Sequence, residues 1–305
     1  KAWLSYSTKD RLAMSVQIYI DGAYIAKEDA KISVFDHGYL YGDGVFEGIR
    51  AYNGKVFKMH EHLERLYESA HHILLDIPIS QDEMAAAMME TLRKNNLSDA
   101  YIRIVVSRGV GDLGLDPRKC SRATVVIIAD HISLFPQEHY DHGLEVITSA
   151  TRQRSHDTFE PRIKSLNYLN NILVKLEAAQ AGAMEAIMLD SQGYVVEGSG
   201  SNIFIVDKKG RLLTPPVYIG ILEGVTRNTV IELAREDGMI VEEQPFTRHD
   251  LYVAAECFLT GTAAELIPVI TVDRRSVGDG KPGKLTKLLM EKFRIYAQNN
   301  GVSFV

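Results

Sequence analysis

Apolar and polar residues alternate over positions 16–20, and the dipeptide Asp21-Gly22 follows directly. Alternation with a period of two places successive side chains on opposite faces of a β-strand. Asp-Gly favours the type I′ turn that joins two antiparallel strands, because both turn positions need a positive φ. The pattern therefore predicts a β-hairpin whose second strand begins at Ala23.

Helical and strand periods follow each other in blocks along the rest of the chain. Apolar residues at helical spacing predict helices over 60–75, 83–95, 167–181, 226–237 and 284–298. Apolar and β-branched runs predict strands over 101–107, 123–129, 144–148, 186–190, 194–197, 202–206 and 211–213. Gln192-Gly193 and Lys209-Gly210 supply tight turns between the later strands. Because the strands cluster as hairpins and do not alternate with helices, we predict an α+β fold and not a doubly wound sheet.

A length of 305 residues accommodates one large domain or two of ordinary size. The stretch 131–143 is charged, contains Pro136 and lacks a clear period, which is typical of an interdomain connection. We therefore divide the chain into four segments. They are an extension or cloning remnant over 1–13, a small N-terminal domain over 14–135, a linker over 136–142 and a large domain over 143–305.

The composition is that of a globular protein, with 46% hydrophobic and 24% charged residues. The net charge of −6 and the absence of a dense Lys/Arg block argue against a nucleic-acid or membrane partner. Two cysteines, Cys120 and Cys257, are too few for a disulfide framework. Because neither a membrane span nor a signal-peptide pattern is visible, we expect a cytoplasmic protein.

Residues 109–114 (GVGDLG) match the glycine pattern of a dinucleotide-binding turn. Such a turn must open a helix inside a βαβ unit, but Leu115-Asp116-Pro117 interrupts any helix directly afterwards. The pattern therefore predicts a glycine-rich loop near a ligand, and a nucleotide-dependent oxidoreductase is the weaker interpretation.

Four histidines, His60, His62, His71 and His72, lie in the first predicted helix. Metal ligands on a helix must be three or four residues apart to share a face. These pairs are only one and two residues apart, so we interpret the four side chains as solvated and predict no metal site.

Most lysines are solvated surface charges, but the residues that accompany Lys164 indicate chemistry. An amine there can form a Schiff base with an aldehyde, and Glu197 can hold a protonated ring nitrogen. The helix start Gly224-Val225-Thr226, together with Thr262, can bind a phosphate through backbone N–H groups and hydroxyls. A lysine, a carboxylate and a phosphate cup are the parts of a pyridoxal 5′-phosphate (PLP) site.

Five motifs carry a family resemblance that covers nearly the whole chain from Met14 onward. They are 41–50 (YGDGVFEGIR), 100–103 (AYIR), 164–168 (KSLNY), 197–202 (EGSGSN) and 260–265 (TGTAAE). The chain resembles the class IV aminotransferases of PLP fold type IV, and more narrowly the branched-chain amino acid aminotransferases. The resemblance implies a two-domain α+β fold, with a smaller N-terminal α/β domain and a larger domain that contains a mixed, barrel-like sheet.

The resemblance also assigns roles to residues at matching positions. It implies that Lys164 forms the Schiff base with the cofactor and that Glu197 contacts the pyridine nitrogen. The implied cofactor-binding residues are Arg65, Lys164, Tyr168, Glu197, Leu222, Val225, Thr226 and Thr262. The implied substrate-binding residues are Phe46, Gly48, Tyr101, Arg103, Ala263, Tyr41 and Leu115. Tyr41 and the loop 113–115 resemble elements that complete a neighbouring subunit's site, which implies at least a homodimer.

The function implied by the resemblance is transamination between L-leucine, L-isoleucine or L-valine and 2-oxoglutarate, which gives branched 2-oxo acids and L-glutamate. One feature departs from the branched-chain pattern. Only Ser165-Leu166 separates Lys164 from Asn167-Tyr168, as in the D-amino acid aminotransferase branch. A D-amino acid aminotransferase or an aminodeoxychorismate lyase is therefore the alternative on the same fold, and a non-catalytic ligand-binding protein is a more remote one.

Overall fold

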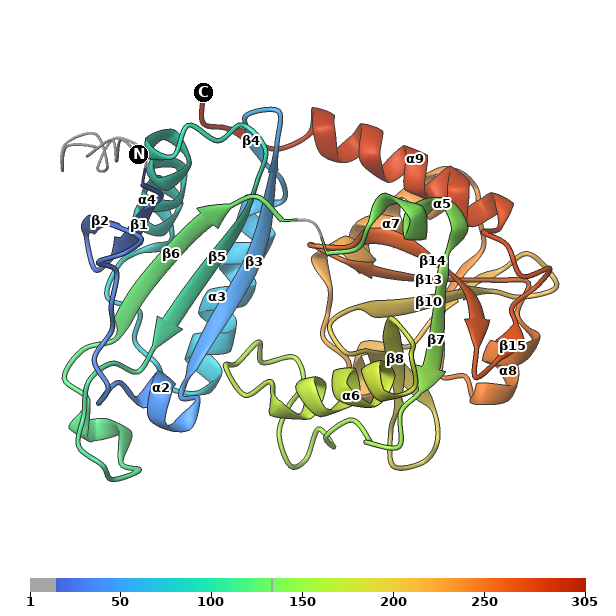
Figure 1. Ribbon diagram of the computed structural model, residues 1–305, viewed down its shortest axis with the longest axis horizontal. Helices are drawn as coiled ribbons and strands as arrows, with labels where there is room; N and C mark the ends of the chain where they lie inside the picture. The colour runs from blue at the N-terminus through green and yellow to red at the C-terminus, as the bar shows by residue number, and fades with distance from the viewer. Residues whose placement is uncertain (1–14, 133) are drawn as a thin grey trace, which may run out of the picture. The chain divides into compact units, whose positions relative to one another are not determined.

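The computed structural model describes residues 15–132 and 134–305 (Figure 1). The predicted extension over 1–13 lies outside the described residues. The described chain forms two compact units. The first unit contains residues 15–132 and the C-terminal segment Gly301–Val305, and the second contains residues 134–300.

The first unit is built on an antiparallel sheet that has seven strands within the described residues. The strands are β1 (Gln17–Ile20), β2 (Ala23–Ala26), β3 (Gly44–Tyr52), β4 (Lys55–Val56), β5 (Ala100–Ser107), β6 (Thr124–Asp130) and β16 (Val302–Ser303). Their order is β16-β4-β3-β5-β6-β1-β2. The predicted hairpin is confirmed as β1 and β2, and its turn residues Asp21 and Gly22 have φ values of 48° and 96°.

Two helices, α3 (Met59–His72) and α4 (Gln81–Lys94), pack against this sheet (Figure 1). Both helices were predicted. A capping box between Ser80 and Glu83 starts α4 two residues before the predicted position. Along β5 the buried residues Ile102 and Ile104 alternate with half-buried ones, so one face belongs to the core and the other carries polar side chains.

The glycine-punctuated run after residue 41 forms the long strand β3, which the sequence analysis did not predict. Glycine usually weakens a strand because it adds no side chain to the packing. At Gly48 the missing side chain is required, since a Cβ there would overlap the Tyr101 hydroxyl. A short helix, α2 (His37–Tyr41), precedes the strand.

The glycine pattern at 109–114 does not open a helix. The segment is a loop followed by the 3-10 turn η1 (Pro117–Lys119), so the structure agrees with the rejection of a dinucleotide-binding turn. Gly109 has a φ of 88°, and a Cβ on it would overlap the carbonyl oxygen of Arg122. The glycine there serves a close approach between two backbone segments.

The second unit contains a mixed sheet that has nine strands within the described residues. They are β7 (Leu144–Thr148), β8 (Glu185–Leu189), β9 (Val195–Gly198), β10 (Asn202–Val206), β11 (Leu212–Thr214), β12 (Val241–Glu243), β13 (Glu256–Gly261), β14 (Glu265–Val272) and β15 (Arg275–Ser276). The order β10-β13-β14-β7-β8-β9 closes on itself because β9 also pairs with β10. The predicted barrel-like sheet is therefore confirmed as a closed ring with both parallel and antiparallel pairs.

The helices of this unit are α5 (Gln137–His142), α6 (Leu169–Gln180), α7 (Val225–Glu236), α8 (Arg248–Val253) and α9 (Lys284–Asn299), with a 3-10 turn η2 (Val217–Ile219). Alternate residues of the ring strands, such as Ile187 and Leu259, share one buried core. On β8 the neighbours of Ile187, Ala186 and Met188, point to the opposite face and pack against α6. The alternation of strand side chains thus covers both faces of the ring with apolar contacts.

The structure differs from the predicted domain boundaries. The range predicted as a linker, 136–142, is largely helix α5 of the second unit, and the last five residues add a strand to the first. A short polar segment beside a proline resembles a linker in sequence, but Pro136 is the N-cap of α5. The strand β16 was missed because only its pairing with β4 defines it.

We predict that Gly109→Ala destabilises the first unit much more than Gly22→Ala. Both residues have positive φ, which costs alanine ~1 kcal/mol, but only Gly109 would also place a methyl group against a carbonyl oxygen. The measurement is the free energy of unfolding from chemical denaturation. Equal losses in the two variants would show that the loop at 109 relaxes without resistance.

Candidate active site

Lys164 lies on a tightly turned segment directly before α6. Its Nζ donates to the hydroxyl oxygen of Tyr168 at 3.2 Å. The Ser165 N–H bonds to the Ile163 carbonyl and the Tyr168 N–H to that of Leu166, which keeps the segment compact. With only Ser165-Leu166 between Lys164 and Asn167-Tyr168, the Tyr168 hydroxyl lies within hydrogen-bond distance of the Lys164 amine.

Glu197 lies in β9 with only 7% of its surface exposed. Its Oε1 accepts a hydrogen bond from Gln153 Nε2 at 2.6 Å, and its Oε2 accepts one from the Leu222 N–H at 3.1 Å. Burial raises the pKa of Glu197 to about 7, although the Leu222 N–H, the charge of Lys164 and the Gln153 amide favour the ionised form. The carboxyl group is thus able to accept a cationic partner near neutral pH.

Asn202, the first residue of β10, ties three segments of the site together. It pairs with Glu197 of β9 on one side and with Thr260 of β13 on the other. Its side-chain amide donates to the Leu222 carbonyl at 2.9 Å. These contacts make β9, the end of β13 and the segment before α7 converge at one end of the ring of strands.

The N-terminus of α7 can bind an anion. Its N-cap, Gly224, provides no side-chain cap, and the first turn contains no acidic residue. Thr226 is buried in that turn, and a Cβ at Gly224 would overlap the Asn202 side chain. The N–H groups and the positive end of the helix dipole therefore favour a phosphate here.

The predicted residues of this unit lie on the converging segments or beside them. Val225 and Thr226 belong to the start of α7 and Leu222 to the segment before it, and Thr262 and Ala263 lie in the turn between β13 and β14. Lys164 and Tyr168 join them from the segment before α6, since the charge of Lys164 acts on Glu197. Asn202 ends the motif 197–202 but was given no role, and Gln153 was missed because a single amide in a polar stretch carries no signal in the sequence.

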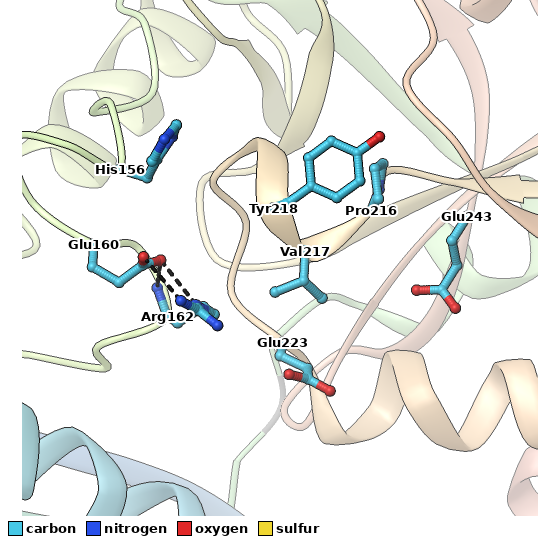
Figure 2. Close-up of a pocket in the computed structure, with 8 residues that line it drawn as sticks. All are labelled: His156, Glu160, Arg162, Pro216, Val217, Tyr218, Glu223 and Glu243. Carbon is cyan, nitrogen blue, oxygen red and sulfur yellow. Dashed lines mark hydrogen bonds and ion pairs between the residues drawn. The ribbon is translucent and has the colours of Figure 1, made fainter.

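A hollow of about 670 Å³ lies on the same unit (Figure 2). Its lining residues are His156, Glu160, Arg162, Pro216, Val217, Tyr218, Glu223 and Glu243. Glu160 pairs with Arg162 at 3.1 Å in the segment that leads to Lys164. The lining includes neither Lys164 nor Glu197, so the hollow does not contain the chemical groups of the site.

Arg227, in the first turn of α7, is buried. It donates to the Pro215 carbonyl at 2.9 Å and pairs with Glu243 at 2.7 Å. Those contacts attach α7 to β12, so Arg227 has a structural role and is not directed at the phosphate cup.

Arg65 lies in the first unit, where it is held by a buried acid. Glu47 is fully buried and accepts bonds from Arg65 Nε at 2.6 Å and from His62 Nδ1 at 2.8 Å. Burial opposes ionisation, but Arg65 and His62 lower the pKa of Glu47 below its usual range. The prediction that His62 is solvated is wrong, because α3 turns it onto β3, whereas the other three histidines of the helix are exposed.

Four predicted substrate-binding residues meet on the sheet of the first unit. Arg103 lies 4.6 Å from the centre of the Phe46 ring and donates to the Tyr101 hydroxyl at 2.9 Å. Gly48 is paired with Arg103 across β3 and β5. The register therefore places an aromatic ring, a hydroxyl and a guanidinium on one face of the sheet.

Tyr41 and the loop 113–115, both predicted to complete a neighbouring subunit's site, contact each other within this chain. The Tyr41 hydroxyl donates to the Leu113 carbonyl at 2.5 Å, and His37 Nε2 lies 2.8 Å from the Asp112 carbonyl oxygen. Leu115 remains 78% exposed. The side chains of α2 thus fix the backbone of a loop whose apolar tip faces solvent.

Neither a metal cluster nor a membrane span is found in residues 15–132 and 134–305. No group of three or more His, Cys, Asp or Glu side chains there could hold a metal ion. No helix in these ranges has both the length and the apolar character to cross a membrane.

Comparison with known proteins places this arrangement in a family. The family model for amino-transferase class IV matches residues 44–272. A Methanocaldococcus jannaschii protein, named provisionally as a branched-chain-amino-acid aminotransferase, is 55% identical over 279 residues, which cover 92% of this chain and 96% of that protein. The chain therefore belongs to the class IV aminotransferases.

Solved structures narrow the similarity to the branched-chain enzymes. The Escherichia coli branched-chain amino acid aminotransferase is 37% identical, with a TM-score of 0.91 over 93% of this chain and 95% of that one. A T.th. branched-chain amino acid aminotransferase complexed with N-(5′-phosphopyridoxyl)-L-glutamate is 36% identical, with a TM-score of 0.87 over 93% and 95%. The resemblance inferred from the five motifs is thus confirmed.

The pKa of Glu197 makes a prediction for the cofactor-free protein. Because this pKa is about 7 in the folded protein, the folded protein binds the proton more tightly than the unfolded chain does. Stability from the neutral carboxyl is therefore present at pH 5 and is lost as pH rises through 7, by on the order of 2 kcal/mol. Glu197→Gln has no carboxyl group at this position, so it lacks this pH-dependent contribution to stability.

The measurement is the free energy of unfolding of both proteins at pH 5 and pH 8. The loss between the two pH values should be larger for the unaltered chain than for Glu197→Gln. Equal losses would mean that Glu197 ionises in the folded protein as it does in the unfolded chain.

Proposed function

We propose that this chain is a PLP-dependent branched-chain-amino-acid transaminase, which moves the amino group of L-leucine, L-isoleucine or L-valine to 2-oxoglutarate. The observation that carries the proposal is the second unit's combination of Lys164, the buried Glu197 and the uncapped start of α7. The family membership and the branched-chain names of the similar proteins support the same reaction.

The residues present fit PLP in three respects. A buried carboxyl with a raised pKa suits a protonated pyridine nitrogen, which would restore its ionised form. The start of α7, with Thr226 and Thr262, suits the phosphate. The amine of Lys164 beside the hydroxyl of Tyr168 suits the aldehyde carbon and the phenolic oxygen. Val225 belongs to the same helix start, and Leu222 contributes through its N–H, which donates to Glu197. Arg65 is proposed from the family resemblance alone, since its side chain bonds to Glu47.

When bound, PLP supplies an aldehyde that takes up the amino group and a ring that delocalises the electron pair left at the substrate's Cα. Lys164 Nζ removes the proton from that Cα and later delivers one. Tyr168 orients Lys164 through the bond between its hydroxyl and Nζ. Glu197 keeps a proton on the ring nitrogen, and the buried setting of its carboxyl strengthens that interaction.

The substrate residues divide by chemistry. Phe46, Tyr41 and Leu115 offer apolar surface to a branched side chain, and one methylene there is worth only about 1–3 kcal/mol, so all three branched substrates are accepted. Arg103 and Tyr101 bind the distal carboxylate of glutamate through charge-assisted hydrogen bonds. The T.th. relative's complex with a phosphopyridoxyl glutamate supports a second substrate of this kind. Gly48 leaves room for the Tyr101 hydroxyl, and Ala263 is proposed as a further substrate contact from the family resemblance.

We also propose that the chain acts as a homodimer or a multiple of dimers. Val34, Tyr39, Leu113 and Leu115 are each at least 68% exposed and lie around α2 and the loop that Tyr41 holds. An exposed apolar patch of this kind marks a protein interface. Its occupant is a second copy of this chain, whose site the loop 113–115 completes. The two free cysteines are consistent with the cytoplasm as the location.

The test of the reaction is turnover of the purified, PLP-loaded protein with 2-oxoglutarate. L-leucine should yield L-glutamate, and Lys164→Ala should lower the rate about 10³-fold or more because it removes the amine that moves the proton. Lys209→Ala, an exposed lysine in a turn, is the control. Turnover of D-alanine with none of L-leucine would instead assign the chain to the D-amino acid aminotransferase branch.

The test of the dimer is a pair of charged substitutions. Leu113→Glu combined with Leu115→Glu should lower the mass measured by sedimentation and reduce activity, because charges in an apolar interface oppose association. Ile240→Glu, at a residue that is 61% exposed elsewhere, should change neither. An unchanged mass and activity in the double variant would place the interface on another surface.

A further inference from the structure

Gln153 is a buried amide that makes the shortest of the hydrogen bonds to Glu197. It lies in the segment between β7 and Lys164 and is 6% exposed. Its Nε2 donates to Glu197 Oε1 at 2.6 Å. Neither the motifs nor the family resemblance assign it a role.

The orientation of this amide is determined by its second partner. Gln153 Oε1 accepts the N–H of Arg154 at 3.1 Å. The ionised form of Glu197 can only accept, and a backbone N–H can only donate, so with Glu197 ionised a flipped amide would lose both bonds. Because the Arg154 N–H requires Oε1 as its acceptor, the NH₂ group of Gln153 faces Glu197.

The segment that presents Gln153 is itself fixed to the structure. Glu177 of α6 accepts the Ala150 N–H at 2.7 Å and the Thr151 N–H at 3.0 Å. The Gln153 N–H bonds to the Leu189 carbonyl of β8 at 3.0 Å. Because its backbone is held on both sides, Gln153 can orient Glu197 and does not simply follow it.

The other groups that face Glu197 complete its surroundings. Leu222 N–H at 3.1 Å and Asn202 Nδ2 at 3.4 Å donate to Oε2, so Gln153 is the partner of Oε1. The cations that act on the carboxyl are Lys164 and Arg154. Donors to both oxygens favour the ionised form, which burial opposes.

Building on the proposed function, we propose that Gln153 is a positioning residue whose amide holds the Glu197 carboxylate ionised and oriented for the ring nitrogen of the cofactor. The substrate never contacts Gln153 in this role. Its effect on the reaction passes through Glu197 alone.

Two variants separate this role from a purely structural one. Gln153→Met has a similar length but neither donates nor accepts. Gln153→Glu keeps the shape and the acceptor for the Arg154 N–H, but it replaces the donor that faces Glu197 with a second acid, and two adjacent acids share one proton. Gln180→Met, at an exposed position of α6, is the control.

The first readout is the infrared carboxyl signal of Glu197 in the cofactor-free protein, assigned by its disappearance in Glu197→Gln. Both Gln153 variants should move the titration of Glu197 to higher pH, while Gln180→Met leaves it unchanged. The second readout is turnover of the PLP-loaded protein, where both variants should lower kcat about tenfold or more, as expected for a lost bond to a charged group. KM for the amino acid should change less.

A Gln153→Glu protein that titrates and turns over like the unaltered chain would overturn the proposal, since the amide would then serve only the Arg154 contact. If Gln153→Met fails to fold, Gln153→Glu decides the question by itself. If the unaltered protein turns over no amino acid, the proposed function is wrong, and the infrared titration still tests whether Gln153 controls Glu197.

Discussion

The burial of the Glu197 carboxyl is the constraint around which the second unit is organised. A carboxyl group in an apolar interior must be neutral or must find donors and a cation. Here the closing strand pair β9 and β10 removes it from water, and donors arrive from Gln153 and Leu222. These donors are too few to hold it fully ionised, so its pKa is raised to about 7 and a cationic ring nitrogen is the missing partner.

The first unit contains a second buried acid with the opposite outcome. Glu47 is also removed from water, but Arg65 and His62 bond directly to its two oxygens and lower its pKa. A guanidinium and an imidazole at hydrogen-bond distance outweigh the cost of burial, whereas neutral amides do not. Glu47 therefore has the character of a completed structural pair, and Glu197 that of a group which awaits a ligand.

Local patterns predicted much of this molecule and failed at identifiable places. The hairpin at Asp21-Gly22, the long helices and the strands with β-branched runs all appear, because their signals lie within a few neighbouring residues. His62 was assigned to solvent, although two residues along a helix reverse the direction of a side chain, so that His60 is exposed and His62 is buried. The segment 136–142 looked like a linker because α5 has only six residues, which are too few to show a helical period.

The sequence by itself determined which chemical groups are available: a lysine, a tyrosine four residues later, a carboxylate in a glycine-rich strand end and an uncapped helix start. These follow from residue type and short spacing, and they carried the family resemblance. The tertiary structure alone decided the protonation of Glu197, the choice of Gln153 and Asn202 as its partners, and the closure of the ring of strands. Burial and long-range strand pairing join residues that lie 44 positions apart, and no local pattern records such a contact.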